Sequence, residues 1–515
     1  MQSLFWLCLG FSALFIFYAL FSTQIVTFDF DYLRELVPVS PDIDEVALFS
    51  TCVLAEFDKD GWTKDVLEKA QVDWDPVKKC DDKFVPFTIL GANGTVWLNK
   101  NKKGVENLNC WARAIYFKDD WHFNASGWFA LQYKSSEVVF NSDFVHTSCQ
   151  TATNISDIKE DFIHLQMWNA KDDGAMKKTT KRPTGMTSTK FPKAKKEEAE
   201  EEKREERPSV FIFVFDSVAN SQALRSLPKT VSLLEHEFES VNLRHVNKAG
   251  ENSHPNGIAF LIGKLITQMD KGIFGMGKEP ADWNETHACY RYFDDEPFIL
   301  KEFTKKGYKS LMAEDWANGV FNYPNCWGFK EAPVTHYMRP FQAYYESDLK
   351  QARTLMGDDQ CLEYHTFLFN YLTKFIKAYK ESPKISMVWA SEVAHNYNDG
   401  LFHIDAQLFN YFREHREVLD KSYTILMGDH GIRWGKVRST WIGEREINNP
   451  MMFVSVPKHL RKRINPILKE NSNKLLTSFD IYASLVDILN EPNLSAVAGP
   501  QGLRGVSFFR PLPPG

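Results

Sequence analysis

Short apolar runs alternate with stretches of helical periodicity over the chain from residue 208 onward. The runs that we interpret as strands are residues 210–215, 241–243, 309–312, 385–390, 423–427 and 451–456. The stretches that we interpret as helices are residues 221–237, 297–305, 361–379, 402–415 and 477–489. Strands that alternate with helices predict an α/β fold, in which helices cover both faces of a mainly parallel sheet.

Residues 25–170 have a different pattern, in which short apolar runs are separated by Gly, Asn and Asp, residues that favour turns. We interpret this region as a smaller, mostly β accessory domain, and we find no catalytic constellation in it. Residues 171–207 are rich in charge and poor in apolar residues, which predicts a solvated linker. The α/β domain would then occupy residues 208–515. The apolar runs of the accessory domain are residues 87–90, 95–98 and 128–133.

Residues 4–21 are apolar and uncharged, and their length is close to the roughly 20 residues that a bilayer span needs. We interpret residues 1–24 as a signal-anchor, with a cleaved signal peptide as the alternative. The first interpretation predicts a single-pass membrane protein with a lumenal or extracellular catalytic domain, and the second predicts a secreted protein. Asn-x-Ser/Thr sequons favour a glycoprotein in either case. They begin at Asn93, Asn124, Asn154, Asn284 and Asn493.

The cysteines lack the C-x-x-C spacing of metal sites, so we expect them to form disulfides in an oxidising compartment. Cys8 lies in the apolar run at the N-terminus. The next group could pair among itself, and its members are Cys52, Cys80, Cys110 and Cys149. The last group leaves one thiol without a partner, and its members are Cys289, Cys326 and Cys361.

Two predicted strands end in acidic residues, Asp216 after residues 210–215 and Asp429-His430 after residues 423–427. Because ligands bind at the carboxyl ends of parallel strands, these side chains are candidates for one site. Ser253 lies on a loop that opens a short apolar helix. A metal held by Asp216, Asp429 and His430 could lower the pKa of the Ser253 hydroxyl and hold it as a nucleophile, so Ser253 is also a candidate metal ligand.

The residues around Ser253 resemble the alkaline phosphatase superfamily, which includes sulfatases, nucleotide pyrophosphatases and phosphoethanolamine transferases. In the sulfatase signature Cys/Ser-x-Pro-x-Arg-x-x-Leu-Leu-x-Gly, Gly257 stands at the Arg position and Phe260 at the first Leu. Ser-His-Pro-Asn is also similar to the Thr-Phe-Pro-Asn of nucleotide pyrophosphatases. The residues that match the sulfatase signature are Ser253, Pro255, Leu261 and Gly263.

Residues 208–510 more closely resemble an animal family of sulfatase-like proteins known as domain of unknown function 229. Several motifs carry this resemblance in the right order along the chain. They are Phe215-Asp216-Ser217, Leu227-Pro228-Lys229-Thr230, Asn247-Lys248 through Pro255-Asn256, Ala313-Glu314-Asp315-Trp316 and Gly428 through Gly435.

The resemblance implies that Asp216, Asp429 and His430 are metal ligands and that Ser253 is the nucleophile. Two carboxylates and an imidazole suit Zn²⁺, with Mn²⁺ or Ca²⁺ as alternatives. His395 matches the first His of a second zinc site in the superfamily's phosphatases, and in a one-metal site it would contact the ester or protonate the leaving group.

The number of ions, one or two, stays open because the second metal site departs from the superfamily's pattern. Its Asp-x-x-x-His motif has Ser391 in place of the Asp, and the acidic Glu392 is out of register. The next histidine after His430 is His459, which follows Pro457-Lys458 and reads as a surface residue.

The departure at Gly257 bears on the substrate. Oxidation of a sulfatase's catalytic residue to formylglycine needs the signature Arg and, in animals, a Cys, and this chain has neither. An unmodified Ser is a normal nucleophile for phosphoryl transfer, so the sequence favours a phosphate ester over a sulfate ester.

We therefore expect a metal-dependent hydrolase, or a transferase that hands the group to an alcohol. The substrate would be an anionic ester on a glycan or a lipid, and Lys248 and Lys264 could neutralise its charge. The net charge of −6, without a basic face interleaved with aromatic residues, excludes a nucleic-acid partner. The rival interpretation is a catalytically inactive glycoprotein that uses the cleft for binding.

Overall fold

The computed structural model of the protein describes residues 64–70, 77, 84–132, 138–151, 158–168, 207–270, 277–347, 362–395, 400–496 and 498–512. Within these ranges, no helix has the length and apolar character that a membrane crossing requires. The predictions for residues 4–21, for the linker up to residue 206 and for the sequon at Asn154 concern residues outside those ranges. The same holds for Cys8, Cys52, Cys80 and Cys361.

A seven-stranded sheet is the centre of the α/β domain, with the strand order β12-β11-β13-β8-β14-β15-β9. The pairs from β12 through β14 are parallel, and only β15 runs against its two neighbours. The predicted mainly parallel sheet is therefore confirmed. Its strands are β8 (Val210–Phe215), β9 (Val241–Asn242), β11 (Lys309–Glu314), β12 (His336–Tyr337), β13 (Lys384–Ala390), β14 (Tyr423–Gly428) and β15 (Met452–Ser455).

The central strand β8 is buried on both faces, which explains its unbroken apolar sequence. Side chains alternate along a strand, so Val210, Ile212 and Val214 enter one hydrophobic core. Phe211, Phe213 and Phe215 enter the other. Each such side chain contributes roughly 1.5–3 kcal/mol through burial.

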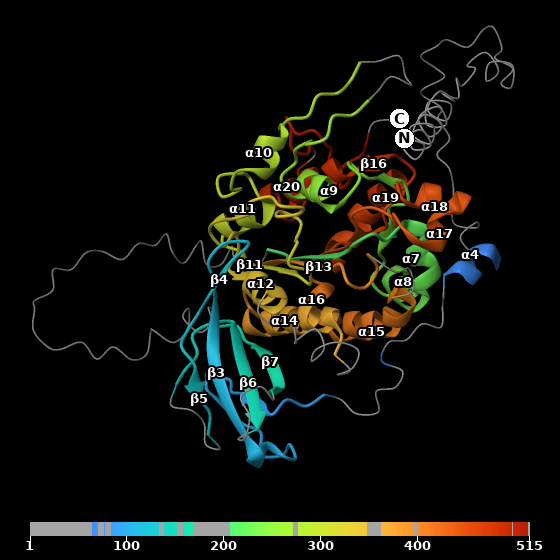
Figure 1. The fold of residues 1–515 in the computed structure, drawn as a ribbon. Coiled ribbons are helices and arrows are strands. Elements are labelled where there is room, and N and C mark those ends of the chain that lie inside the picture. The colour runs from blue at the N-terminus through green and yellow to red at the C-terminus, as the bar shows by residue number, and fades with distance from the viewer. Residues whose placement is uncertain are drawn as a thin grey trace, which may run out of the picture. The chain divides into compact units, whose positions relative to one another are not determined.

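Helices cover both faces, as the alternation of strands and helices predicts (Figure 1). The first core is covered by α9 (Ser253–Leu261), α11 (Ile299–Lys305), α19 (Arg461–Asn471) and α20 (Ser478–Asn490). The second is covered by α7 (Asn220–Ser226), α8 (Pro228–His236), α12 (Arg339–Ser347), α14 (Tyr364–Ala378) and α15 (Gly400–Glu414). The other helices of this domain are α10 (Glu285–Cys289), α16 (Arg416–Leu419), α17 (Gly435–Arg438) and α18 (Trp441–Glu446).

The helix predicted over residues 221–237 is in fact two helices, α7 and α8, which break at Leu227. Leu227 has φ −119° and ψ 44°, and Pro228 occupies the first turn of α8. Proline lacks an N–H and disfavours the helical conformation of the residue before it, so a helix cannot run through this point unbroken. The apolar periodicity continues across the break, which is why the pattern alone predicts one helix.

Strands also dominate the described residues from 84 to 168, so the smaller, mostly β domain is confirmed as a fold. A five-stranded antiparallel sheet lies there beside a separate pair, β1 with β2. The disulfide Cys110–Cys149 joins two residues that face each other on β3 and β6. The strands are β1 (Thr88–Leu90), β2 (Val96–Leu98), β3 (Leu108–Phe117), β4 (Phe123–Ala125), β5 (Phe129–Ala130), β6 (Phe144–Thr151) and β7 (Ile158–Leu165).

Five shorter elements remain, and two of them are the 3₁₀ helices η2 (Val105–Asn107) and η5 (Lys458–Leu460). The helix α4 (Lys64–Lys69) precedes the β domain. A parallel pair of short strands, β10 (Val246–Asn247) and β16 (Leu476–Thr477), lies outside the seven-stranded sheet.

Candidate active site

Neighbouring parallel strands end at the same level and deliver the candidate residues to one edge of the sheet. Phe215, the last residue of β8, is paired in register with Ala390 of β13 and with Gly428 of β14. The residues that follow, Asp216 and Asp429, therefore emerge side by side, as a parallel sheet predicts.

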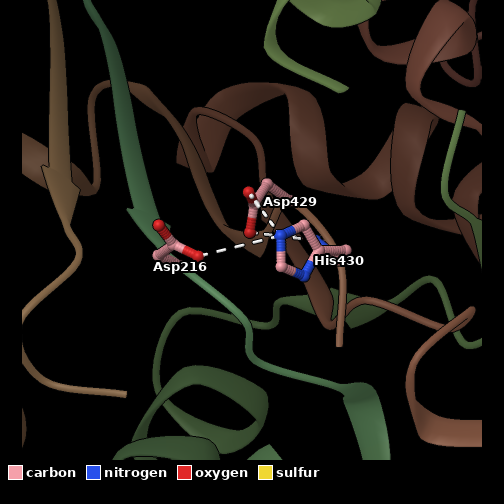
Figure 2. A group of neighbouring side chains, drawn as sticks. All are labelled: Asp216, Asp429 and His430. Carbon is pink, nitrogen blue, oxygen red and sulfur yellow. Dashed lines mark hydrogen bonds and ion pairs between the residues drawn. The ribbon is translucent and has the colours of Figure 1, made fainter. Parts of the chain in front are cut away.

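Asp216, Asp429 and His430 form a buried cluster (Figure 2). The Nε2 atom of His430 lies 3.4 Å from Oδ2 of Asp429 and 3.8 Å from Oδ1 of Asp216. The three possible ligand atoms lie within 4.8 Å of one another, which is compatible with a single ion between them. Among the residues that the structure describes, this is the only such group.

The polar atoms of the cluster fit a metal ion. Oδ2 of Asp429 and Nε2 of His430 are buried, and neither makes a hydrogen bond. Nδ1 of His430 donates to the carbonyl oxygen of Gly431 over 2.7 Å, which leaves the Nε2 lone pair directed at the carboxylates. Burial raises the pKa of Asp216, and the neighbouring Asp429 raises it further, so a cation here would offset an unfavourable concentration of negative charge.

Ser217 joins the two carboxylates of the cluster. Its amide donates to Oδ1 of Asp429 over 3.0 Å, and its hydroxyl donates to Oδ1 of Asp216 over 2.9 Å. Ser217 has a φ of +65°, a left-handed conformation that is uncommon for a residue other than glycine. This role of Ser217 could not be predicted from the sequence, because a Ser after a strand gives no signal of its backbone conformation.

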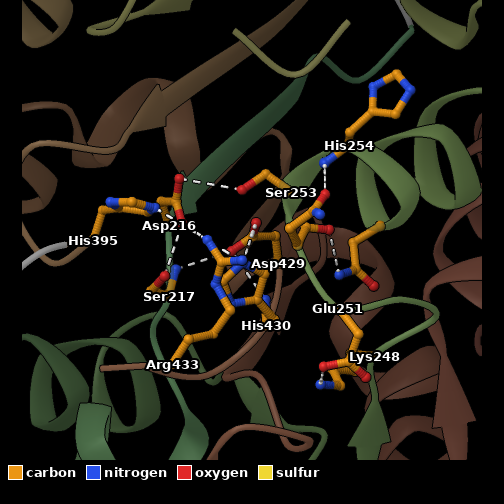
Figure 3. Close-up of polar contacts among 12 residues, drawn as sticks. Asp216, Ser217, Lys248, Glu251, Ser253, His254, His395, Asp429, His430 and Arg433 are labelled. Atoms are coloured by element: carbon orange, nitrogen blue, oxygen red, sulfur yellow. Dashed lines mark hydrogen bonds and ion pairs between the residues drawn. The ribbon is translucent and has the colours of Figure 1, made fainter. Parts of the chain in front are cut away.

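Ser253 is the first residue of α9, and the side chain of Asn252 caps this helix by accepting from the amide of His254 over 3.2 Å. The Ser253 hydroxyl donates to Oδ2 of Asp216 over 3.2 Å (Figure 3). The structure thus brings Ser253 to the cluster, at a helix N-terminus whose dipole favours negative charge.

A cavity of about 220 Å³ opens over Ser253 and Asp216. His395 lines it, and Nη2 of Arg433 donates to Nε2 of His395 over 3.4 Å. Arg433, which follows Asp429-His430 closely in the chain, adds to the site a cation that is not among the residues predicted from the sequence. The other lining residues are Asn252, Glu314, Trp316, Asn318, Gly319, Val320, Tyr323, Trp389, Ser391 and Trp434.

Several candidates lie apart from the cluster. Neither Lys248 nor Lys264 lines the cavity, and Nζ of Lys248 pairs with Glu251 over 2.8 Å. Glu392 is exposed. His459 lies at the surface, 3.5 Å from Asn493, as the sequence predicts.

Gly257 is packed closely against Val320. A Cβ atom at this position would lie 2.0 Å from Cγ2 of Val320, so a larger residue here requires the Val320 side chain to move.

The chain belongs to the family described as Protein of unknown function (DUF229), whose family model matches residues 73–515. No curated protein matches the chain.

Solved structures that resemble the chain share little of its sequence. The phosphonate monoester hydrolase SpPMH from Silicibacter pomeroyi is 11% identical, with a TM-score of 0.40 over 58% of this chain and 76% of that one. The sulfatase PsFucS1 from Pseudoalteromonas sp. is 12% identical, with a TM-score of 0.35 over 58% and 72%. The lipoteichoic acid synthase LtaP from Listeria monocytogenes is 13% identical, with a TM-score of 0.36 over 60% and 76%.

Proposed function

We propose that the protein is a metal-dependent hydrolase or transferase that acts on a phosphate ester through Ser253. One observation carries the proposal: the Ser253 hydroxyl contacts a carboxylate of a buried Asp/Asp/His cluster in which two polar atoms have no hydrogen bond. Asp216, Asp429 and His430 would hold the ion, with Ser253 as a further ligand. Zn²⁺ suits this donor set best, with Mn²⁺ and Ca²⁺ as alternatives.

A divalent cation bound there supplies positive charge that stabilises the alkoxide of Ser253 and the developing charge on the ester. Asp216, which already accepts the Ser253 hydroxyl proton in a hydrogen bond, orients the Oγ atom. The Oγ atom would give its proton to the Asp216 carboxylate as it attacks phosphorus. The bond from phosphorus to the alcohol oxygen breaks, and the alcohol leaves with a proton from His395 or from water. Water, or a second alcohol in a transferase, then displaces Ser253 and releases the phosphoryl group.

His395 and Arg433 face this reaction from the cavity wall. Arg433 would bind the ester's anionic oxygens with its planar guanidinium. His395 would contact the ester or donate the proton to the departing alcohol. Arg433 would thus neutralise the charge of the ester, a role that the sequence suggests for Lys248 and Lys264.

Phosphate is favoured over sulfate by two residues. Position 253 holds Ser, and position 257 holds a glycine packed closely against Val320. The formylglycine of a sulfatase therefore lacks its sequence requirements. The alcohol of the substrate would belong to a glycan or a lipid in the secretory pathway or outside the cell.

The secretory location rests on the sequence. Residues 1–24 would anchor or export the chain, residues 25–170 would form the accessory domain and residues 171–207 the linker. The sequons within the described residues are all exposed, as glycosylation requires, and they are Asn93, Asn124, Asn284 and Asn493.

The second candidate function is a binding glycoprotein without turnover. The observation in its favour is Ser391, which stands where the superfamily's zinc phosphatases have an Asp ligand. The same ligand cluster would then hold an anion without transferring it.

The decisive experiment combines metal analysis with an ester panel. The purified full chain would be assayed for bound metal and tested with p-nitrophenyl phosphate, bis(p-nitrophenyl) phosphate and p-nitrophenyl sulfate. We expect about one equivalent of metal and turnover of a phosphate ester. Metal without any turnover would favour the binding function, and turnover of the sulfate ester alone would overturn the phosphate assignment.

A further inference from the structure

We propose that the turn between β3 and β4 is a positioning element for the wall of the candidate active-site cavity. We call residues 118–122 the hairpin turn and residues 316–329 the wall loop. In this proposal the β domain helps to shape the site, because Asp120 and Trp121 of the hairpin turn hold the wall loop in place.

The wall loop forms a large part of the cavity. Trp316, Asn318, Gly319, Val320 and Tyr323 all line it. The position of this loop therefore decides how much room a substrate has beside Ser253.

Asp120 is inserted into the end of the wall loop and is only 1% exposed. Its amide donates to the carbonyl oxygen of Phe329 over 3.0 Å, and the Phe329 amide donates back to Oδ2 of Asp120 over 2.8 Å. Its Oδ1 accepts from the hydroxyl of Tyr337 over 2.8 Å. Gly328 adopts φ +66°, and a Cβ there would lie 2.0 Å from the Asp120 carboxylate, so the loop is shaped around this side chain.

Two further contacts attach the hairpin turn to the middle of the wall loop. The indole N–H of Trp121 donates to the carbonyl oxygen of Cys326 over 2.7 Å, and Cys326 forms a disulfide with Cys289. The side-chain amide of Asn322 donates to the carbonyl oxygen of Asp120 over 3.3 Å. The hairpin turn thus contacts the wall loop at three separate points.

Arg339 links Asn322 to the residues that line the cavity. Its Nη2 donates to Oδ1 of Asn322 over 2.7 Å, and its Nη1 donates to the carbonyl oxygen of Ala317 over 2.7 Å. Arg339 also lies 3.7 Å from Glu314, which accepts from the amide of Val320 over 2.7 Å. Displacing the hairpin turn would therefore loosen the residues that line the cavity.

These contacts are separate from those that attach the β domain elsewhere. Oδ2 of Asp143 accepts from the hydroxyl of Tyr371 over 2.7 Å and lies 2.5 Å from Nδ1 of His336. Phe144 packs against Tyr371 nearby. The β domain therefore has other attachments, and the contacts of Asp120 are available for positioning the wall loop.

The chemistry of Asp120 also supplies a conservative variant. Burial raises the pKa of Asp120 to about 7, although Arg339 opposes this shift. An Asn at this position could accept from the Phe329 amide and donate to the Tyr337 hydroxyl oxygen, without a buried charge. Asp120→Asn should therefore keep the wall loop in place, whereas Asp120→Ala leaves the Phe329 amide without its acceptor.

Amide hydrogen exchange of the full chain tests the proposal without any need for a substrate. The amides of Val320, Asn322 and Tyr323 all donate hydrogen bonds, so their exchange is measurable. We expect Asp120→Ala to speed exchange over residues 316–323 by about 10-fold, and Asp120→Asn to restore protection. Val145→Ala, in the core of the β domain, is the matched control: it removes buried methyl groups of that domain but none of the contacts of the hairpin turn, so exchange over residues 316–323 should rise no more than exchange within the β domain.

A kinetic arm adds a second readout with p-nitrophenyl phosphate. Asp120→Ala should raise KM more than it lowers kcat and leave the bound metal unchanged, because the loop shapes the cavity but supplies none of the proposed ligands. Where Asp120→Ala does not fold, Trp121→Phe removes the indole N–H together with part of the ring of an exposed side chain, and it should give a smaller change of the same kind.

The proposal would be overturned if Asp120→Ala and Val145→Ala showed the same exchange over residues 316–323. It would also be overturned if Asp120→Ala folded and both it and Trp121→Phe exchanged these amides at the wild-type rate. A wild-type protein that turns over no ester counts against the proposed function alone, since the exchange measurement still decides the role of the hairpin turn.

Discussion

The hydroxyl of Ser253 lies 3.2 Å from Oδ2 of Asp216, although the two residues are 37 positions apart in the chain. Asp216 follows the end of the central strand β8, and Ser253 stands in the first turn of α9. Asp216 thus belongs both to the proposed metal cluster and to the environment of the proposed nucleophile. A change at Asp216 should therefore affect both the metal and the nucleophile, so Ser253 and Asp429 are needed to test them apart.

Replacement of Ser253 by Ala tests the nucleophile. If Ser253 attacks the ester, Ser253→Ala should lower turnover on the order of 10³-fold or more while substrate binding is largely kept. A labelled substrate should leave a phosphoryl adduct on Ser253 in the wild type and none in the variant. Near-full turnover by Ser253→Ala would mean that water attacks directly, and a formylglycine at position 253 would point to sulfate esters.

Replacement of either cluster carboxylate tests the metal site. Asp216→Asn and Asp429→Asn should each remove bound metal, because each takes away an anionic ligand. Asp405→Asn is a matched control, since Asp405 is also buried but accepts from the amides of Lys229 and Thr230. Metal analysis and circular dichroism would be run together, and unchanged metal in both cluster variants would show that the proposed site is wrong.

Variants of Ser217 distinguish the effect of backbone strain from the support that its hydroxyl gives to the proposed metal ligands. Ser217→Gly tolerates φ +65° but loses the hydroxyl that contacts Asp216. It should fold stably yet bind metal about 10- to 100-fold more weakly, as loss of a ligand's supporting hydrogen bond predicts. Ser217→Ala should show the same metal defect and be less stable than Ser217→Gly by about 1 kcal/mol, because Ala keeps the strain of the left-handed conformation. Metal titration and thermal melts distinguish the two effects, and wild-type affinity in Ser217→Gly would remove the supporting role.

Arg433 should govern substrate affinity. Arg433→Ala should raise KM for an anionic ester by about 10-fold or more, and Arg433→Lys should recover only part of the loss because the planar fork is gone. Lys436→Ala changes an exposed cation in the same segment and serves as the control. Steady-state kinetics at two salt concentrations would measure the effect, and equal KM values in Arg433→Ala and Lys436→Ala would exclude a specific contact.

Glycosylation tests the location. Protein from its own cells should lose mass on treatment with an N-glycosidase, and Asn→Gln changes at Asn93, Asn124, Asn284 and Asn493 should reduce that loss stepwise. An unglycosylated protein in the cytosol would contradict the secretory proposal.

The sequence predicts the central sheet and the ligand cluster for the same physical reason. A strand buried on both faces needs an unbroken apolar run, and an acidic residue directly after it must lie at the sheet edge. Asp216 and Asp429 follow β8 and β14 in this way, so their meeting could be expected from the pattern. Ser253 could be placed there through its signature.

Other features depend on contacts that no local pattern encodes. The roles of Ser217 and Asp120 come from a backbone conformation and from a partner loop distant in sequence. The helix α19 was not predicted, because its exposed face is rich in Lys and Arg and few apolar residues mark its buried face. Lys248 and Arg433 have the same charge in the sequence, and only the fold shows which of them faces the cavity.

The packing around Gly257 makes position 257 sensitive to the conformation of one neighbour. The backbone of Val320 is held by the hydrogen bond from its amide to Glu314 and by the contact of its carbonyl oxygen with Nδ1 of His254 over 2.7 Å. A residue larger than glycine at position 257 therefore requires the Val320 side chain, which lines the cavity, to move. A substitution at position 257 would in this way alter the cavity wall without touching the proposed ligands.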